Sequence, residues 1–422
     1  MISRGKAGRC VCRQGYSSSH LSGRYFGQSG PLFWLYIRTS LLTLVTLGIY
    51  RFWAKTRIRK YIWSATAGGE DSFEYTGTGL EKFLGFLVAI VILAIFLGLL
   101  NILLVFAGLN VMGAFDGTGS ELAQIAVIYA NLLALLPLML FAAYRARRYK
   151  LARTRWRGLR FGMDNGAWGY VLRALGYYLL VVLSLGILTP LATFRLEKYM
   201  IDRTWYGDAR MAQDGKWTAL YGGMKHLAIA LVILVGGGAA AIMMEAETLG
   251  AIAFFVGYIW FLVGAIYYRV YAFNYMMRNR VLDGVVTFDA QAETGRVITI
   301  FIIGMLALIG ASIAGAIVLA IIGSIFGAAI VSPQVISNPE LLLTNTGGLI
   351  VAGILLGVFY IGFILALGGV NLVMITQKVI AHVVNSVTVA NAPHLDQIQQ
   401  RAADTGADAE GFADALDIGG AI

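Results

Sequence analysis

Residues 83–109 read FLGFLVAIVILAIFLGLLNILLVFAGL and contain no charged side chain. A helix needs about 20 apolar residues to cross the hydrocarbon core of a bilayer, so this stretch is long enough to span it. Five further stretches have the same character: 122–144, 218–243, 249–272, 297–331 and 347–376. The sequence therefore predicts an all-α polytopic membrane protein with six full transmembrane helices.

The composition of the whole chain agrees with this fold class. Of the 422 residues, 58% are apolar and only 13% are charged, whereas soluble domains are nearer half apolar and a quarter charged. A soluble fold would have too little polar surface to cover it. A net charge of +10 would suggest nucleic acid in a soluble chain, but beside apolar spans we expect the cations to face lipid headgroups. No nucleic-acid partner is predicted.

The placement of Lys and Arg predicts which connections face the cytoplasm. The connections 110–121, 244–248 and 332–346 contain neither residue and are expected outside. Residues 144–173 and 195–216 are strongly basic and are expected inside. Both termini are then expected in the cytoplasm.

Two shorter apolar segments, 40–54 and 174–194, conflict with simple hydropathy because basic residues flank each of them on both sides. If either segment crossed the membrane, a basic stretch would lie outside. We therefore expect two short re-entrant or interfacial helical segments that enter and leave on the cytoplasmic side. A topology with eight crossings is the alternative.

The two short segments are related in sequence, which predicts an internal parallel duplication. The triplet Leu-Gly-Ile at 47–49 recurs at 185–187, and Arg57 is matched by Arg195 at the same offset. The expected organisation is a disordered basic N-terminal tail 1–23, repeat unit one 24–158, repeat unit two 159–290, a third transmembrane hairpin 291–391 and an acidic cytoplasmic tail 392–422. The acidic tail is expected to be solvated and flexible; folding back onto the basic face is the alternative.

Short alternating runs after several glycines predict strands. They lie at 72–75, 159–161 and 285–288. We expect these short cytoplasmic strands to pair with one another.

Several of these stretches resemble a known family. The motifs are YFG at 25–27, LTLVTLGIY at 42–50, FWAK at 52–55, FEYTGTG at 73–79 and, in the second unit, TFRLEKY at 193–199. Together they resemble the YjgN-like family of bacterial inner-membrane proteins, which carry a domain of unknown function, over roughly 24–390. The resemblance implies a location in the bacterial inner membrane. It supplies no catalytic residue, cofactor or substrate.

The Gly and Pro interruptions of the two short segments are the strongest pointer to a function. Paired broken segments in corresponding positions form the substrate sites of many transporters, because free backbone groups at a break can bind an ion or a polar solute. We therefore expect a small-solute transporter or channel with its pathway near the breaks. The candidate residues are Arg38, Thr46, Gly48, Tyr50, Arg173, Ser184, Gly186, Thr189, Pro190, Lys225 and His226. The alternative at the breaks is a pair of interfacial wedges.

Two of these candidates belong to a span. Lys225 and His226 are expected about one and a half turns inside the helix predicted at 218–243, where an ionisable group marks a functional site by default. Snorkelling of Lys225 to the interface is the alternative. Asn101, Asn131 and Asn371 are expected to form hydrogen bonds between helices.

Basic clusters beside the spans support a second function, a non-transporting scaffold that binds anionic lipid or protein partners. Each cation near an anionic bilayer contributes about 1 kcal/mol of attraction. The candidate residues are Lys55, Arg57, Arg59, Lys60, Arg145, Arg147, Arg148 and Lys150. The alternative is that these clusters only fix the topology. The small-residue pattern at Gly323 and Gly327 permits close helix approach and hence a homo-oligomer.

No motif predicts an enzyme, a metal site or a cofactor. Cys10 and Cys12 alone cannot complete a tetrahedral zinc site. The phosphate-binding, zinc-protease and serine-hydrolase signatures do not occur. The spans also lack the carboxylates on which proton coupling usually depends.

Overall fold

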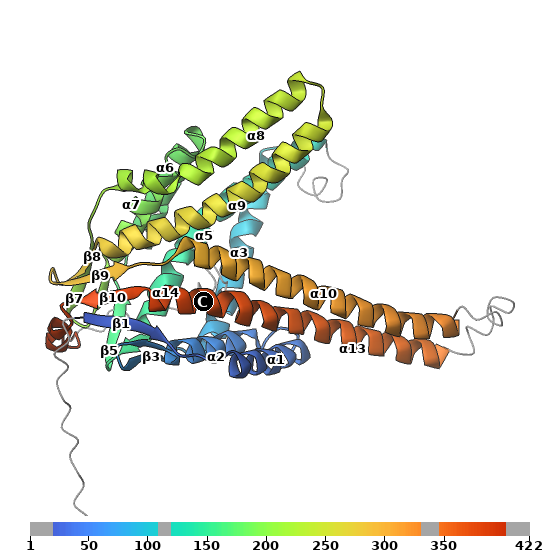
Figure 1. Ribbon diagram of the computed structural model, residues 1–422, viewed down its shortest axis with the longest axis horizontal. Coiled ribbons are helices and arrows are strands. Elements are labelled where there is room, and N and C mark those ends of the chain that lie inside the picture. The colour runs from blue at the N-terminus through green and yellow to red at the C-terminus, as the bar shows by residue number, and fades with distance from the viewer. Residues whose placement is uncertain (1–19, 109–119, 331–345, 402–422) are drawn as a thin grey trace, which may run out of the picture.

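The computed structural model describes residues 20–108, 120–330 and 346–401, and its strands gather at one end while long helices project from them (Figure 1). Helical hairpins alternate with strands along the chain. The hairpins are α1 (Ser29–Val45) with α2 (Arg51–Ser64), α3 (Gly79–Phe106) with α5 (Glu121–Ala152), α6 (Ala167–Leu183) with α7 (Thr189–Ile201), α8 (Lys225–Met243) with α9 (Glu247–Arg278), and α10 (Thr294–Ile330) with α13 (Thr346–Asn371).

Short elements complete the chain. The 3₁₀ helix η1 (Trp217–Gly223) precedes α8, the π-helical turn η2 (Leu372–Thr376) and α14 (Gln377–Asn385) continue α13, and the 3₁₀ helix η3 (Ala392–Gln397) follows the last strand. The strands are β1 (His20–Tyr25), β2 (Thr66–Gly68), β3 (Asp71–Tyr75), β4 (Thr154–Trp156), β5 (Leu159–Met163), β6 (Thr204–Tyr206), β7 (Ala209–Gln213), β8 (Arg280–Leu282), β9 (Val286–Ala290) and β10 (Val387–Ala390).

These strands pair in an antiparallel cycle, named here the strand ring. Each strand pairs with the next along the chain, and β1 pairs with β10 through His20 opposite Ala390. Each helical hairpin thus leaves one strand of the ring and returns to its neighbour. The short runs predicted at 72–75, 159–161 and 285–288 coincide with β3, β5 and β9, so a wholly α description of the fold is incomplete.

Six helices are long and apolar enough to cross a membrane in the described part of the chain, as the hydropathy predicts. They are Gly79–Phe106, Glu121–Ala152, Lys225–Met243, Glu247–Arg278, Thr294–Ser324 and Gly353–Asn385. Asn101 and Asn131 exchange side-chain hydrogen bonds of 3.2 and 3.3 Å between α3 and α5, which confirms their predicted role. Asn371 lies just before the π-helical turn η2, and its hydrogen bond between helices stays a prediction. The chain is therefore a polytopic helical membrane protein.

The other two hairpins are much shorter. Helices α1 and α6 each have 17 residues, so each is about 25 Å long, whereas α5 and α9 have 32 residues. Both short hairpins begin and end at the strand ring. We call α1 with α2 and α6 with α7 the two short hairpins.

Three expected boundaries differ from those observed. The predicted span 218–243 begins as the separate 3₁₀ helix η1, so Lys225 and His226 lie in the first turn of α8 and not one and a half turns inside it. Residues 20–23 belong to β1 and not to a disordered tail, while 1–19, with Cys10 and Cys12, lie outside the described residues. Residues 392–401 pack against the ring instead of being a solvated tail, because Leu395 and Ile398 are buried there; 402–422 lie outside the description.

Candidate functional site

The two breaks predicted from sequence form the tips of the short hairpins, and they share one backbone geometry. At the end of α1, the Gly48 amide donates to the carbonyl of Thr43 at 2.7 Å, and at the end of α6 the Gly186 amide donates to that of Val181 at 2.8 Å. A second bond lies beside each of these: the Leu47 amide donates to the carbonyl of Leu44, and the Leu185 amide donates to that of Val182, both at 3.0 Å. Each pair of bonds forms a Schellman motif, which satisfies the last carbonyls of the helix.

The hydroxyl groups at the breaks are used within these turns. The Thr46 hydroxyl accepts from the Tyr50 amide at 2.9 Å, and the Ser184 hydroxyl accepts from the Leu188 amide at 3.0 Å. The Thr189 hydroxyl donates to the carbonyl of Gly186 at 2.6 Å. The breaks are therefore closed turns whose polar groups bond to one another.

A leucine occupies the left-handed position of each turn. Leu47 has φ +50° and Leu185 has φ +51°, a conformation that costs an L-residue about 1–2 kcal/mol and in which glycine is usual. Their side chains are 94% and 89% exposed, so contacts within the chain do not offset that cost. Both tips thus present an apolar side chain to the surroundings.

Of the remaining pathway candidates, Pro190 directly follows the second tip, and the others lie apart from the tips. Arg38 is exposed on α1, while Arg173 on α6 stacks on the Tyr199 ring at 4.7 Å; Pro190 is in the first turn of α7. On α8, Lys225 lies over the Tyr267 ring at 4.8 Å, and the ring centroids of His226 and Tyr267 are 4.6 Å apart.

The basic clusters separate into internal and exposed members. Arg59 is buried and donates to the Tyr75 hydroxyl at 3.2 Å, and buried Arg148 donates to the carbonyl of Met163 at 3.0 Å. Lys55, Arg145 and Lys150 are half-buried. Arg57 and Lys60 are exposed on α2, and Arg195 is exposed at the matching position of α7.

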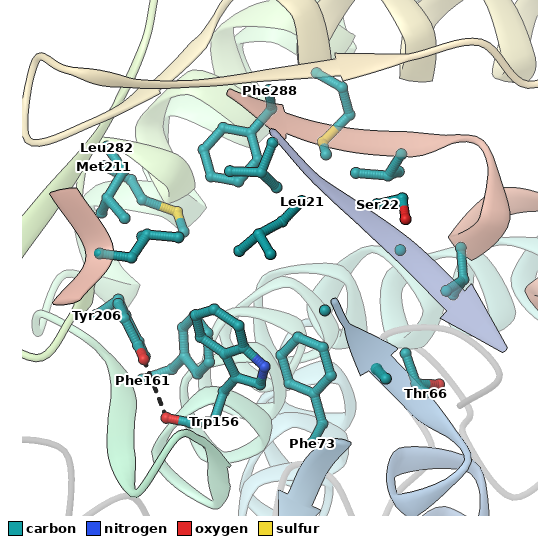
Figure 2. Close-up of a pocket in the computed structure, with 18 residues that line it drawn as sticks. Leu21, Ser22, Thr66, Phe73, Trp156, Phe161, Tyr206, Met211, Leu282 and Phe288 are labelled. Carbon is teal, nitrogen blue, oxygen red and sulfur yellow. Dashed lines mark hydrogen bonds between the residues drawn. The ribbon is translucent and has the colours of Figure 1, made fainter. Parts of the chain in front are cut away.

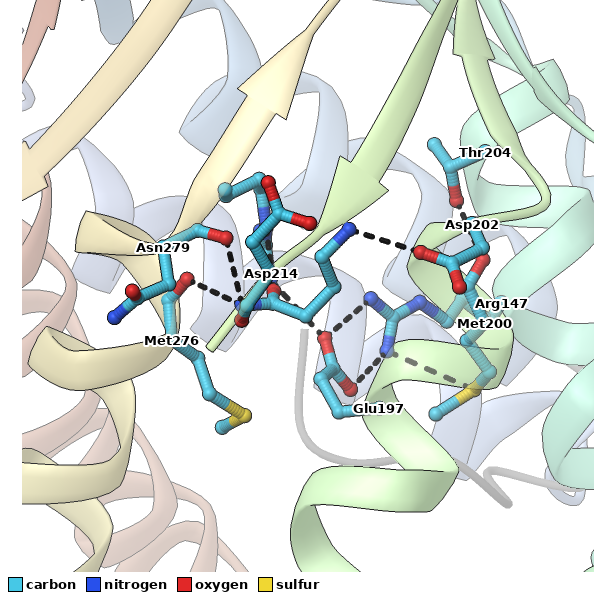
Figure 3. Close-up of polar contacts among 10 residues, drawn as sticks. Arg147, Glu197, Met200, Asp202, Thr204, Asp214, Met276 and Asn279 are labelled. Atoms are coloured by element: carbon cyan, nitrogen blue, oxygen red, sulfur yellow. Dashed lines mark hydrogen bonds and ion pairs between the residues drawn. The ribbon is translucent and has the colours of Figure 1, made fainter. Parts of the chain in front are cut away.

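One cation of the clusters belongs to a half-buried charge network that the sequence did not single out. The guanidinium of Arg147 on α5 makes two parallel hydrogen bonds of 2.8 Å to the carboxylate of Glu197 on α7 (Figure 3). Arg280 on β8 lies 3.3 Å from the same carboxylate. Burial raises the pKa of Glu197, but the two arginines outweigh it and hold that pKa below its ordinary value. The network joins two hairpins to strand β8 of the ring. The sequence signal that could have revealed it is a lone glutamate within a basic segment.

An apolar chamber of about 280 Å³ lies inside the strand ring (Figure 2). Alternate side chains of a strand point to opposite faces, so one face of every strand turns inward. The wall includes Leu21, Phe73, Trp156, Phe161, Tyr206, Met211, Leu282 and Phe288. The residues next to these in sequence, which belong to the opposite face of each strand, include Glu74, Arg155, Arg160 and Arg210. The sequence does not predict the chamber, because a three-residue strand has too few positions to show alternation of apolar and polar residues.

Residues 391–401, named here the C-terminal cap, lie across the ring at the end where the strands turn. Leu395 lines the chamber. Asp396 pairs with Arg157 in the β4–β5 turn at 2.8 Å, His394 contacts Asp283 in the β8–β9 turn at 3.0 Å, and the Gln399 amide donates to Asp208 in the β6–β7 turn at 3.0 Å. The cap closes this end of the chamber.

Across the described ranges 20–108, 120–330 and 346–401, no group of three or more His, Cys, Asp or Glu side chains is placed to hold a metal ion.

Comparison with known proteins gives a family and one relative. The model of the family described as bacterial protein of unknown function (DUF898) matches residues 20–415. The relative named inner membrane protein YjgN, from Salmonella typhimurium (strain LT2), is 28% identical over 162 residues, which is 38% of this chain and 36% of the relative. The match thus spans about a third of that curated relative. No solved structure matches.

Proposed function

Because the chain belongs to the family of bacterial proteins of unknown function (DUF898), we propose its function from the site itself. The chain is a scaffold of the bacterial inner membrane, with the strand ring and both termini in the cytoplasm. Its two short hairpins, which arose by internal duplication, enter the cytoplasmic leaflet as wedges and bind anionic lipid. The relative's name supports the location.

The exposed leucines at strained positions carry this proposal. A leucine that costs energy in the turn and makes few contacts within the chain is best explained by contact with lipid. Arg57 follows the start of α2 by six residues and Arg195 follows the start of α7 by six, so each lies about 9 Å behind its tip. Interfacial helices sink about 5–10 Å, which brings both arginines to the phosphate level.

A small-solute pathway near the breaks is the rival proposal. Its support is the similarity of the two turns, but their hydroxyls already have partners within the turns. The two proposals differ in what surrounds the tips, which is lipid for the wedges and water for a pathway.

Lipid binding tests the scaffold directly. Native mass spectrometry of the purified protein, titrated with phosphatidylglycerol or phosphatidylcholine, should show preference for the anionic lipid. The double variant Arg57→Gln/Arg195→Gln should bind phosphatidylglycerol about 30-fold more weakly, from about 1 kcal/mol per cation. Arg24 is an exposed arginine on β1 of the ring, away from the short hairpins' tips, so Arg24→Gln is the matched control. It should leave the affinity for phosphatidylglycerol unchanged. Equal affinity in the double variant would refute lipid binding by the short hairpins.

Accessibility of the tips separates the two proposals. Leu47→Cys and Leu185→Cys would be made singly in a chain whose Cys10 and Cys12 are replaced by serine. Wedges predict no reaction with an impermeant maleimide and strong quenching of a tip-attached fluorophore by acyl-chain nitroxides. Reaction of position 185 with the maleimide, together with solute flux in proteoliposomes, would favour the pathway.

A further inference from the structure

We propose that the strand ring binds one hydrocarbon chain, from a lipid or a fatty acid, in its apolar chamber. This site is separate from the short hairpins and does not depend on the proposed function. Protein interiors contain few voids larger than a water molecule, whereas this chamber of about 280 Å³ has the volume of about nine waters in the liquid.

Water is a poor occupant because the wall gives it few partners. The Tyr206 hydroxyl donates to the carbonyl of Trp156 at 3.0 Å, and the Trp156 indole donates to that of Asp71 at 3.0 Å. The Thr66 hydroxyl donates to the carbonyl of Ile62 at 2.9 Å. A buried water needs two to four polar partners, and large apolar cavities stay dry and take up apolar molecules. The chamber is therefore suited to hydrocarbon.

The shape of the chamber favours a chain that enters from the helix side. Its lining runs from Leu395 in the C-terminal cap to Met277 near the end of α9 and Val384 in α14. The C-terminal cap closes the end at Leu395. The opposite end, at Met277 and Val384, lies where the helices leave the ring. From β2 to β9, strands of three residues alternate with strands of five, which rise about 10 and 16 Å. A wall of this height around so small a volume fits an extended chain better than a compact molecule.

Photolabelling locates the ligand. The full-length protein in micelles would be irradiated with diazirine-bearing palmitic acid or with phosphatidylglycerol bearing the same acyl chain, then mapped by peptide mass spectrometry. We expect label on peptides of β3, β5, β7 or β9. Labelling by phosphatidylglycerol assigns the chain to a bilayer lipid, and labelling by palmitic acid alone assigns it to a free fatty acid.

Filling the chamber tests the site. Met211→Trp places a larger side chain at a flexible wall position and should reduce strand labelling at least tenfold, with the melting temperature monitored as a check on folding. Ala67→Phe, on β2, is an independent filling variant. Arg57→Gln/Arg195→Gln should keep full strand labelling, so failure of the lipid-binding wedges would not affect this result. Label confined to transmembrane helices, or unchanged in both filling variants that fold, would overturn the proposal.

Discussion

Leucines at the tips of the short hairpins and leucines in the strand ring have opposite surroundings. Leu282 in β8 is 2% exposed and packs in the ring core, while Leu47 is 94% exposed in a strained turn. The same side chain therefore contributes to folding in one region and not in the other. The ring holds the hairpins together by apolar packing and a half-buried charge network, and the tips are free to make contacts outside the chain.

The largest expected effect is on the charge network that joins the hairpins to the ring. Glu197→Leu removes the carboxylate and leaves Arg147 and Arg280 facing each other, which should destabilise the fold by about 3 kcal/mol, the lower end of the cost for a buried pair, because these side chains are only half-buried. Chemical unfolding in mild detergent measures the loss. A variant as stable as the parent would mean that the hairpins are joined mainly by apolar packing.

The two leucine environments can be compared with one substitution. Leu282→Ala should destabilise the protein by about 2–5 kcal/mol, because it removes apolar contacts in the ring and enlarges the chamber that Leu282 lines. Leu47→Ala, the matched control, should change stability by no more than about 0.5 kcal/mol in the same detergent. Similar losses at the two positions would contradict the comparison.

Acid should weaken the ring before it affects the tips. The pKa of Glu197 is held below its ordinary value of 4.5, so the stability from its ionised form is present above that pH and is lost as the pH falls through the lowered pKa. The melting temperature should therefore decline below about pH 4.5. Glu197→Gln should show a shallower decline, and an unchanged acid profile would assign the loss to other carboxylates.

The turn leucines should respond in two opposite ways. Leu47→Gly and Leu185→Gly relieve the left-handed strain and should stabilise the protein in detergent by about 1 kcal/mol each. In bilayers the same variants should lower the quenching of a fluorophore at Ile49→Cys or Ile187→Cys by acyl-chain nitroxides. Destabilisation in detergent would mean that the tips pack within the chain.

The smallest effect is expected at the C-terminal cap. Arg157→Gln removes pairs to Asp71 and Asp396 that water reaches, so the loss should be below about 1 kcal/mol. Hydrogen exchange of residues 391–401 should increase, with the amides of α9 unchanged as the internal control. Unchanged exchange in the cap would show that Leu395 and Ile398 alone hold it.

The sequence predicted the membrane helices but only part of the ring. Long apolar runs such as 83–109 are decided locally, so hydropathy places them well. Strands of three residues, such as β6 with the sequence TWY, have too few positions for alternation. One of the two partners of β1 is β10, which lies more than 360 residues further along the chain. The sequence also located the breaks at 46–50 and 184–190. It could not show that the hydroxyls of Thr46, Ser184 and Thr189 bond within the turns, because that depends on the geometry of each turn.

Pairing of β1 with β10 also sets the order in which the protein is completed during synthesis. The N-terminal strand emerges from the ribosome first, yet its partner at Val387–Ala390 emerges only after the last long hairpin. Until then, the edges of β1 and β9 lack their shared neighbour and the chamber has a gap in its wall. The ring therefore closes only once the last of the described hairpins has been made, so a closed ring reports that the hairpins before it have already been synthesised.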